Sequence, residues 1–164
     1  MGKRINIIPY PQLKKYSSLD SCFQNNGCFV LFFETVSDST GHWQCVFKIN
    51  NVYEFWDSYG LIPSGDKNYI QNNILVQLDE IKPYLPDIID NEIQRGSTII
   101  FNTIDYQKWV GSVSTCGRHV CSRLLHKDLN EKQYFTYLTK YMQENKLNSF
   151  DEAVVKITYD IIRK

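Results

Sequence analysis

Two neighbouring segments rich in aromatic and β-branched residues constrain the fold of this chain more than any other feature. Residues 43–49 (WQCVFKI) and 52–57 (VYEFWD) are typical of strands, and only Asn50 and Asn51 separate them. A two-residue Asn-Asn loop favours a type I′ hairpin, because Asn tolerates positive φ better than most residues. Such a loop fixes the register of the two strands, since Ile49 must then pair with Val52.

This register places four polar side chains on one face of the hairpin. Gln44 lies opposite Asp57, and His42 lies opposite Tyr59. His42 and Asp57 are then diagonal neighbours with Cβ atoms at most roughly 7–8 Å apart, a gap that an imidazole and a carboxylate can bridge with a hydrogen bond. The other face is apolar except for Glu54 and carries Trp43, Cys45, Phe47, Ile49, Val52 and Trp56. We therefore expect the apolar face to form the core and the His42/Asp57 face to be open to a site.

Strands are predicted in the first two thirds of the chain. The apolar run 28–34 (CFVLFFE) and the segment 97–102 (STIIFN) suit two further strands. Residues 60–95 are ambiguous, because they contain three prolines and at most one helix, near 69–79.

The last third changes to a helical pattern. Helices are expected over 116–125, over 131–144 behind an Asn130 cap with Gln133 in the capping-box position, and from Ser149 onward. Strands followed by helices predict an α+β fold, with a central mixed β-sheet packed against helices. The 164 residues contain no repeat and no Gly/Ser linker, so we expect a single domain over 1–164.

Composition excludes several classes of protein. Lys plus Arg and Asp plus Glu both number 18, and this zero net charge argues against strong nucleic-acid binding. No run approaches the roughly 20 apolar residues that a membrane span needs, so no membrane association is expected. The five cysteines form no CxxC pair, which argues against a disulfide framework or a zinc site. We expect a soluble intracellular protein with a free reactive thiol and with neither a metal nor a cofactor.

Cys116 is the best candidate for a nucleophile beside the His42/Asp57 pair. It lies where a polar segment becomes a helix, and Gly117 follows it and leaves close access. The helix N-terminus and a nearby imidazolium both lower a thiol pKa, and the thiolate is the form that attacks a carbonyl. Gln107 lies nine residues upstream, and its side-chain amide could form an oxyanion hole with the Cys116 backbone N–H.

These residues together resemble a known family. The order Gly41-His42-Trp43, then Asp57 within FWDSYG, then Gln107, then Cys116-Gly117 is similar to that of the adenain/Ulp1-like cysteine proteases. The resemblance spans 41–121 and is closest to the viral maturation proteases of adenovirus, virophages and Polinton/Maverick elements. The acid is Asp57, as in the cellular branch, whereas adenovirus-type enzymes often use Glu.

The resemblance implies a papain-like/adenain-like core and the activity of a thiol endopeptidase. His42 would be the general base, Asp57 the residue that orients it, Cys116 the nucleophile and Gln107 the oxyanion-hole donor. The substrates implied are viral capsid and core precursor proteins, cleaved during virion maturation in the virion and in the virus factory of the host cytoplasm. An activating peptide is compatible with this type of enzyme.

Two other functions remain open from the sequence. A deubiquitinase or deSUMOylase would share the fold and the triad but act on host conjugates. A catalytically inactive binding module would keep the same residues without a reactive thiol. Cleavage of ubiquitin- or SUMO-derived reporters and labelling of Cys116 would distinguish these alternatives.

Three further expectations concern single residues. The resemblance implies that Trp43 roofs a narrow tunnel that admits Gly-containing substrates, although strand alternation would place Trp43 on the face opposite His42. His119 shares a helix face with Cys116 but has no carboxylate nearby in sequence, so we expect no catalytic role. The remaining cysteines are expected to be structural (Cys22, Cys28, Cys45 and Cys121).

Overall fold

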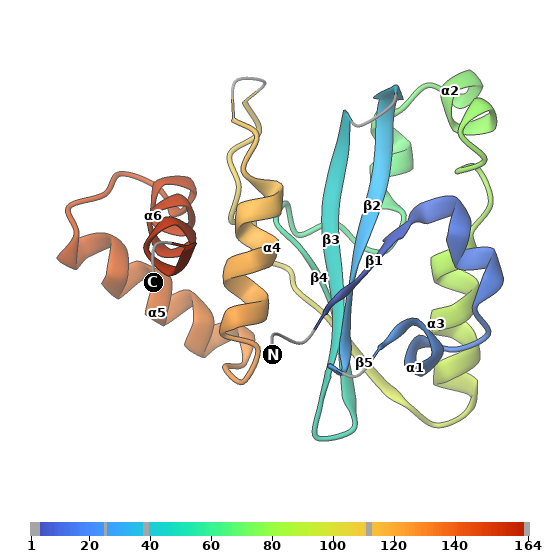
Figure 1. Cartoon of the computed structure of the whole chain (residues 1–164), viewed down its shortest axis with the longest axis horizontal. Coiled ribbons are helices and arrows are strands. Elements are labelled where there is room, and N and C mark those ends of the chain that lie inside the picture. The colour runs from blue at the N-terminus through green and yellow to red at the C-terminus, as the bar shows by residue number, and fades with distance from the viewer. Residues whose placement is uncertain (1–3, 25, 38–39, 111–112, 163–164) are drawn as a thin grey trace.

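The computed structural model describes residues 4–24, 26–37, 40–110 and 113–162. The chain forms an α+β fold around a five-stranded mixed sheet with the strand order β1-β2-β3-β4-β5 (Figure 1). The strands are β1 (Asn6–Pro9), β2 (Cys28–Ser37), β3 (Thr40–Ile49), β4 (Val52–Asp57) and β5 (Thr98–Phe101). The three central strands are antiparallel, and each edge strand is parallel to its neighbour. The predicted fold class is confirmed.

The β3–β4 hairpin has the predicted turn and register. Asn50 and Asn51 both have positive φ, of 48° and 63°, as a type I′ turn requires. Ile49 pairs with Val52, and Gln44 pairs with Asp57. The predicted pairing of His42 with Tyr59 is wrong, because the ladder ends at Asp57 and the chain turns there. Past the end of β4, His42 has no partner strand on that side.

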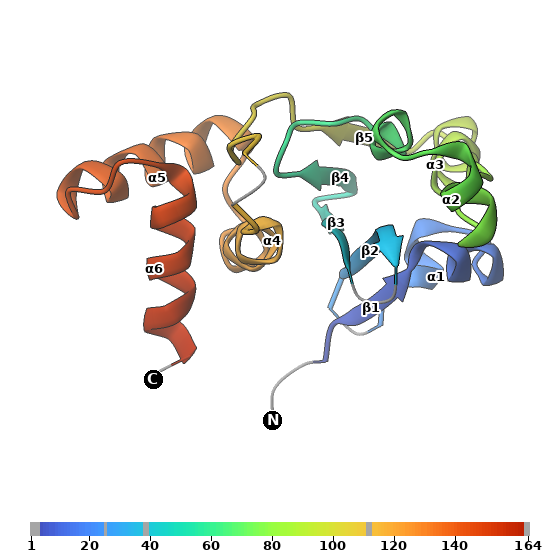
Figure 2. The same cartoon turned by 90° about the horizontal axis from the view of Figure 1, so that it is seen from above.

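Both faces of the sheet are buried, which corrects the expectation of one open face. Figure 2 shows helices on both sides of the sheet. One core lies against η1 (Tyr10–Lys15), α1 (Leu19–Cys22) and α3 (Tyr84–Gln94) and contains Val46, Tyr53 and Phe55 from the face that carries His42. The other lies against α4 (Cys116–Leu125), α5 (Glu131–Glu144) and α6 (Phe150–Ile162) and contains Cys45, Phe47 and Trp56. A site can therefore open only at the end of the sheet.

Glu54, the polar exception on the predicted apolar face, forms a buried ion pair. Its carboxylate accepts from Nε and Nη2 of Arg123 on α4 at 2.9–3.1 Å, and the Arg123 side chain is fully buried. Arg123 also donates to the carbonyls of His126 and Leu129. Removal of one partner from such a pair typically costs about 3–5 kcal/mol, so this contact fixes α4 on the sheet.

The helices of the last third begin and end close to the predicted positions. α4 and α5 have the predicted bounds, Asn130 and Gln133 form the capping box of α5, and α6 begins after Ser149. Within 60–95, the chain forms η2 (Gly65–Tyr69), α2 (Asn72–Gln77) and α3, where one helix was expected. α3 was not predicted because Pro83 and Pro86 precede and enter its first turn, a position that tolerates proline.

In the part of the chain that the structure describes, none of the helices has the length and apolar character that crossing a membrane requires.

Candidate active site

The four predicted catalytic residues come from four segments and meet at one end of the sheet. His42 lies on β3, Asp57 is the last residue of β4, Gln107 lies in the loop after β5, and Cys116 is the first residue of α4. All four are buried, with the Cys116 residue 6% exposed. His42, Gln107 and Cys116 line one cavity of about 300 Å³.

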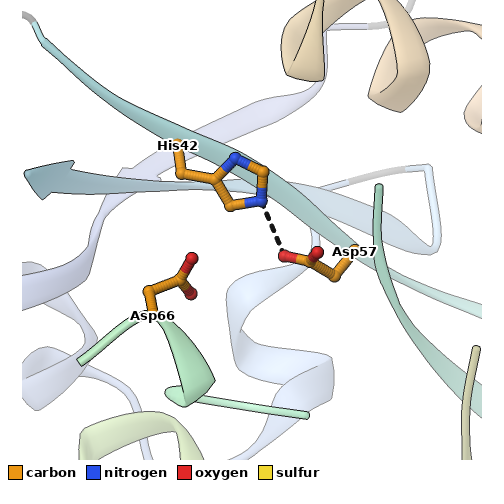
Figure 3. A group of neighbouring side chains, drawn as sticks. All are labelled: His42, Asp57 and Asp66. Atoms are coloured by element: carbon orange, nitrogen blue, oxygen red, sulfur yellow. Dashed lines mark hydrogen bonds and ion pairs between the residues drawn. The ribbon is translucent and has the colours of Figure 1, made fainter. Parts of the chain in front are cut away.

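The His42 imidazole is bonded to the Asp57 carboxylate. The distance from Nε2 of His42 to Oδ2 of Asp57 is 2.7 Å (Figure 3). Tyr59 N–H donates to the other carboxylate oxygen at 2.7 Å, so both oxygens of Asp57 are held. Because a carboxylate accepts, this bond assigns the proton to Nε2 and leaves Nδ1 to interact with a thiol.

Asn102 fixes the backbone of Asp57 and was not predicted from the sequence. Its Oδ1 accepts from the Asp57 N–H at 2.8 Å, and its Nδ2 donates to the Asp57 carbonyl at 2.6 Å. Asn102 follows β5, so this double bond ties the end of β4 to the next strand of the sheet. The sequence holds no signal for it, since the two residues lie 45 positions apart.

The environment of Cys116 favours its thiolate. Burial raises the pKa of the thiol, but the hydrogen bond to His42, the charge of His42 and the backbone N–H groups of Trp43 and Gly117 outweigh burial and lower the pKa below its usual value. The Trp43 N–H is available because an antiparallel ladder would pair it with Ser58, beyond the end of β4. The early end of β4 therefore frees a donor for the sulfur.

The same environment favours the imidazolium. Burial lowers the pKa of His42, but the hydrogen bonds to Asp57 and Cys116 and the charges of Asp57 and Asp66 raise it to about 10. A thiol with a lowered pKa next to an imidazole with a raised pKa can exchange one proton to form an ion pair.

Asp66 adds a second carboxylate that sequence reasoning missed. It lies on η2, and the Gln44 side chain bridges the two acids, with Nε2 donating to Asp57 at 2.8 Å and to Asp66 at 2.6 Å. Burial, together with the charge of Asp57, raises the pKa of Asp66 to about 6, against the effect of His42. Gln44 was predicted on this face, but nothing in the sequence indicates its second partner.

His42, Asp57 and Asp66 also form the candidate metal-binding group of the described residues. One ligand atom from each, an imidazole nitrogen and two carboxylate oxygens, lies within 4.8 Å of the others (Figure 3). Their spacing allows a divalent cation, although the hydrogen bond between His42 and Asp57 would have to break for the nitrogen to ligate it.

Gln107 is held firmly beside the cavity. Its Oε1 accepts from the Ser58 hydroxyl at 2.8 Å, and its Nε2 donates to the Tyr59 hydroxyl at 2.9 Å and to the Val113 carbonyl at 3.3 Å. The bond to Val113 is the longer one, so this is the N–H group that a substrate oxygen could most easily compete for.

An aromatic wall beside His42 was also not predicted. The Tyr59 ring stacks on His42 with centroids 5.1 Å apart, and Trp109 stacks on Tyr59 at 4.1 Å. Trp109 is 51% exposed and lines the cavity with Tyr59 and Tyr69. The isolated aromatics of this loop carry no periodic pattern, so the sequence could not place them.

Trp43 lies on the face opposite His42, as strand alternation predicts. Its ring packs on Phe32 with centroids 4.4 Å apart and lies over Gly117, where an added Cβ would come within 3.5 Å of Cδ1. Trp43, Cys116 and Gly117 line a second hollow of about 760 Å³. Cys116 therefore lies between two hollows, one bordered by His42 and one by Trp43.

His119 forms a second buried His–Asp pair. Nε2 of His119 lies 3.1 Å from Oδ1 of Asp151, and the His119 residue is 0% exposed. The carboxylate that the sequence lacked nearby comes from α6, 32 positions later. Cys22, Cys28 and Cys45 are buried with pKa values raised by burial, whereas Cys121 is exposed.

Comparison with known proteins identifies a viral relative. The chain is 31% identical over 159 residues to the uncharacterized protein V9 of Sputnik virophage, and the alignment covers 96% of this chain and 88% of that protein. No family model matches the sequence, and no solved structure matches it. Identity at this level over nearly the whole length shows common descent, so the chain belongs to the family of the Sputnik virophage protein V9.

Proposed function

We propose that this protein is a thiol endopeptidase of the adenain/Ulp1-like type. One observation carries the proposal: His42 bonds the Asp57 carboxylate at 2.7 Å and also bonds the thiol of Cys116, which begins α4. A nucleophile, a base and a group that orients the base in this order are the parts that covalent acyl transfer requires. The mixed sheet with Cys116 at a helix N-terminus is compatible with a papain-like/adenain-like core.

In the proposed reaction, the Cys116 thiolate attacks the scissile carbonyl carbon and forms a C–S bond. The His42 imidazolium gives its proton to the amide nitrogen, the C–N bond breaks, and a thioester remains. His42 then takes a proton from water, whose oxygen attacks the thioester and releases Cys116 as the thiolate. Asp57 keeps the ring in the required orientation throughout.

The oxyanion would be stabilised at the N-terminus of α4. The Cys116 backbone N–H belongs to the unpaired first turn of the helix, where the dipole favours negative charge. Gln107 lines the same cavity and would add its side-chain N–H by exchanging the 3.3 Å bond to Val113.

The virophage relative supports a viral role for the proposed protease. Its substrates would be capsid and core precursor proteins, cleaved during virion maturation in the virus factory of the host cytoplasm and in the virion. Dependence on an activating peptide is compatible with this proposal.

The proposal is tested by incubating the purified protein with the capsid and core proteins of its virus and mapping new termini by mass spectrometry. The wild type should generate discrete termini, and Cys116→Ala should generate none while it retains the wild-type melting temperature. Equal cleavage by the Cys116→Ala variant would overturn the assignment. Cleavage of ubiquitin- or SUMO-derived reporters with intact virion proteins would favour a deconjugating enzyme instead.

Trp43 is the proposed determinant of specificity. The indole over Gly117 narrows the hollow next to Cys116, and such a wall favours substrate residues with little side chain. We expect cleavage between or after Gly residues, of the Gly-Gly↓X or X-Gly↓Gly type, with an aliphatic residue further upstream. In a peptide library, efficient cleavage with bulky residues on both sides of the bond would contradict this specificity.

A further inference from the structure

Asp151 of α6 joins three groups that do not belong to its own helix. Its Oδ1 lies 3.1 Å from Nε2 of His119 and also accepts from the Thr115 hydroxyl. Its Oδ2 accepts from the Lys108 backbone N–H at 3.3 Å. An acidic residue in the first turn of a helix usually interacts with that helix or with water, so this buried carboxylate has a different role.

The three partners are next to the candidate catalytic residues. Lys108 follows Gln107, and Thr115 immediately precedes Cys116. Thr115 occupies the N-cap position of α4, yet its side chain makes no capping bond and donates to Asp151 instead. One carboxylate therefore connects the loop that carries the predicted oxyanion donor with the turn that carries the predicted nucleophile.

The helical layer behind α4 supplies this carboxylate. Figure 2 shows α6 on the side of α4 that faces away from the sheet. The Glu54–Arg123 pair holds α4 from the sheet side, and Asp151 holds its N-terminal turn from the opposite side. The charge of Asp151 persists at neutral pH, because burial raises its pKa but the bonds from His119, Thr115 and the Lys108 N–H lower the pKa by more.

We propose that Asp151 is a positioning residue of the thiol protease, one that fixes the Gln107 loop relative to the first turn of α4. The inference rests on the proposed function and goes beyond it, because it makes α6 a required part of the active site. A misplacement of about 1 Å between reacting groups can cost about 10²-fold in rate, so one lost tether of this kind should affect catalysis.

The experiment compares the wild type with Asp151→Ala, Asp151→Asn and the matched control Glu152→Ala. Glu152 is the exposed neighbour of Asp151 on the same helix turn, and its carboxylate only accepts from the Asn148 N–H. The substrate is the fluorogenic peptide Leu-Arg-Gly-Gly-aminomethylcoumarin. Turnover is expressed per mole of Cys116 that iodoacetamide titrates, with the labelled cysteine identified by mass spectrometry, so that unfolded molecules do not lower the measured kcat.

Asp151→Ala should lower kcat by about 10- to 100-fold and change KM by less than threefold. Asp151→Asn keeps one acceptor oxygen and should fall between Asp151→Ala and the wild type, which also provides a reading if the Ala variant does not fold. Glu152→Ala should stay within twofold of the wild type. A purely structural role would lower the melting temperature and leave kcat per titrated site unchanged.

The two proposals fail in different ways. Wild-type turnover that Cys116→Ala abolishes, combined with unchanged kcat per site in both Asp151 variants, would overturn the role of Asp151 alone. Absence of peptide and virion-protein cleavage by the wild type would overturn the proposed function and the inference together.

Discussion

The molecule contains two buried His–Asp pairs on opposite sides of Cys116, and their surroundings differ. His42 and Asp57 lie 2.7 Å apart, and His42 lines the cavity that Cys116 shares. His119 and Asp151 lie 3.1 Å apart, and the His119 ring is fully enclosed and stacks on Trp56. Residue types and distances are therefore nearly the same in the two pairs, and only access to a thiol and to a cavity distinguishes them.

This comparison shows why a His–Asp contact alone is weak evidence for catalysis. His42 has a second ring nitrogen with a thiol partner, whereas Nδ1 of His119 has no hydrogen-bond partner among the described protein atoms. His42 is positioned to transfer a proton, and His119 is positioned to anchor a helix. Mutations of the two residues should therefore affect different measured quantities.

The largest expected difference is between His42→Ala and His119→Ala. His42→Ala should lower kcat by at least about 10⁴-fold with little change in the melting temperature, because it removes the base. His119→Ala should keep kcat per folded molecule within about tenfold but lose about 2–4 kcal/mol of stability, because it leaves a cavity in the core. Chemical denaturation and peptide turnover on the same preparations measure both quantities. Full activity of His42→Ala would remove the functional distinction between the pairs.

Gln107→Ala should have a smaller effect on the side of the site that Asp151 tethers. Loss of one oxyanion donor typically lowers kcat by about 10²–10³-fold, whereas KM should change little because the bond forms in the transition state. Gln107→Glu is a useful companion variant, since it keeps the size but not the donor. A loss below about threefold in the Ala variant would assign the oxyanion hole to other donors.

The smallest expected effect concerns Asp66, the carboxylate that His42 has and His119 lacks. The pKa of Asp66 is raised in the folded protein to about 6, so its proton contributes stability that is present below about pH 4 and is lost as the pH rises through about 6. The free energy of unfolding of Asp66→Asn should therefore gain on that of the wild type between pH 4 and pH 6, by at most about 3 kcal/mol.

Urea unfolding at pH 4, 5, 6 and 7 measures this gain in free energy. Asp90→Asn is the control, because Asp90 is an exposed carboxylate on α3 and its replacement should show no comparable trend. A constant difference between Asp66→Asn and the wild type across this range would contradict the raised pKa of Asp66.

Local signals in the sequence determined much of the scaffold. The Asn50-Asn51 loop set the register that brings Gln44 opposite Asp57, because a two-residue I′ turn allows one pairing of the flanking strands. Capping residues and apolar periodicity fixed the bounds of α4 and α5, because helix termini depend on neighbours within one turn. The expectation that the His42 face would be open was wrong, because the hairpin alone does not show that helices from residues 10–22 and 84–94 cover that face.

Only the tertiary structure decided which polar side chains meet at the site. Asn102 reaches Asp57 across 45 positions, and Asp151 reaches Thr115 across 36. Asp66 reaches Gln44 from a short 3-10 helix that no periodic pattern predicts. The sequence by itself determined the order of His42, Asp57, Gln107 and Cys116 and the elements that carry most of them. Their mutual distances depend on long-range packing of layers, which leaves no local pattern in the chain because each contact joins residues whose sequence neighbours are unrelated.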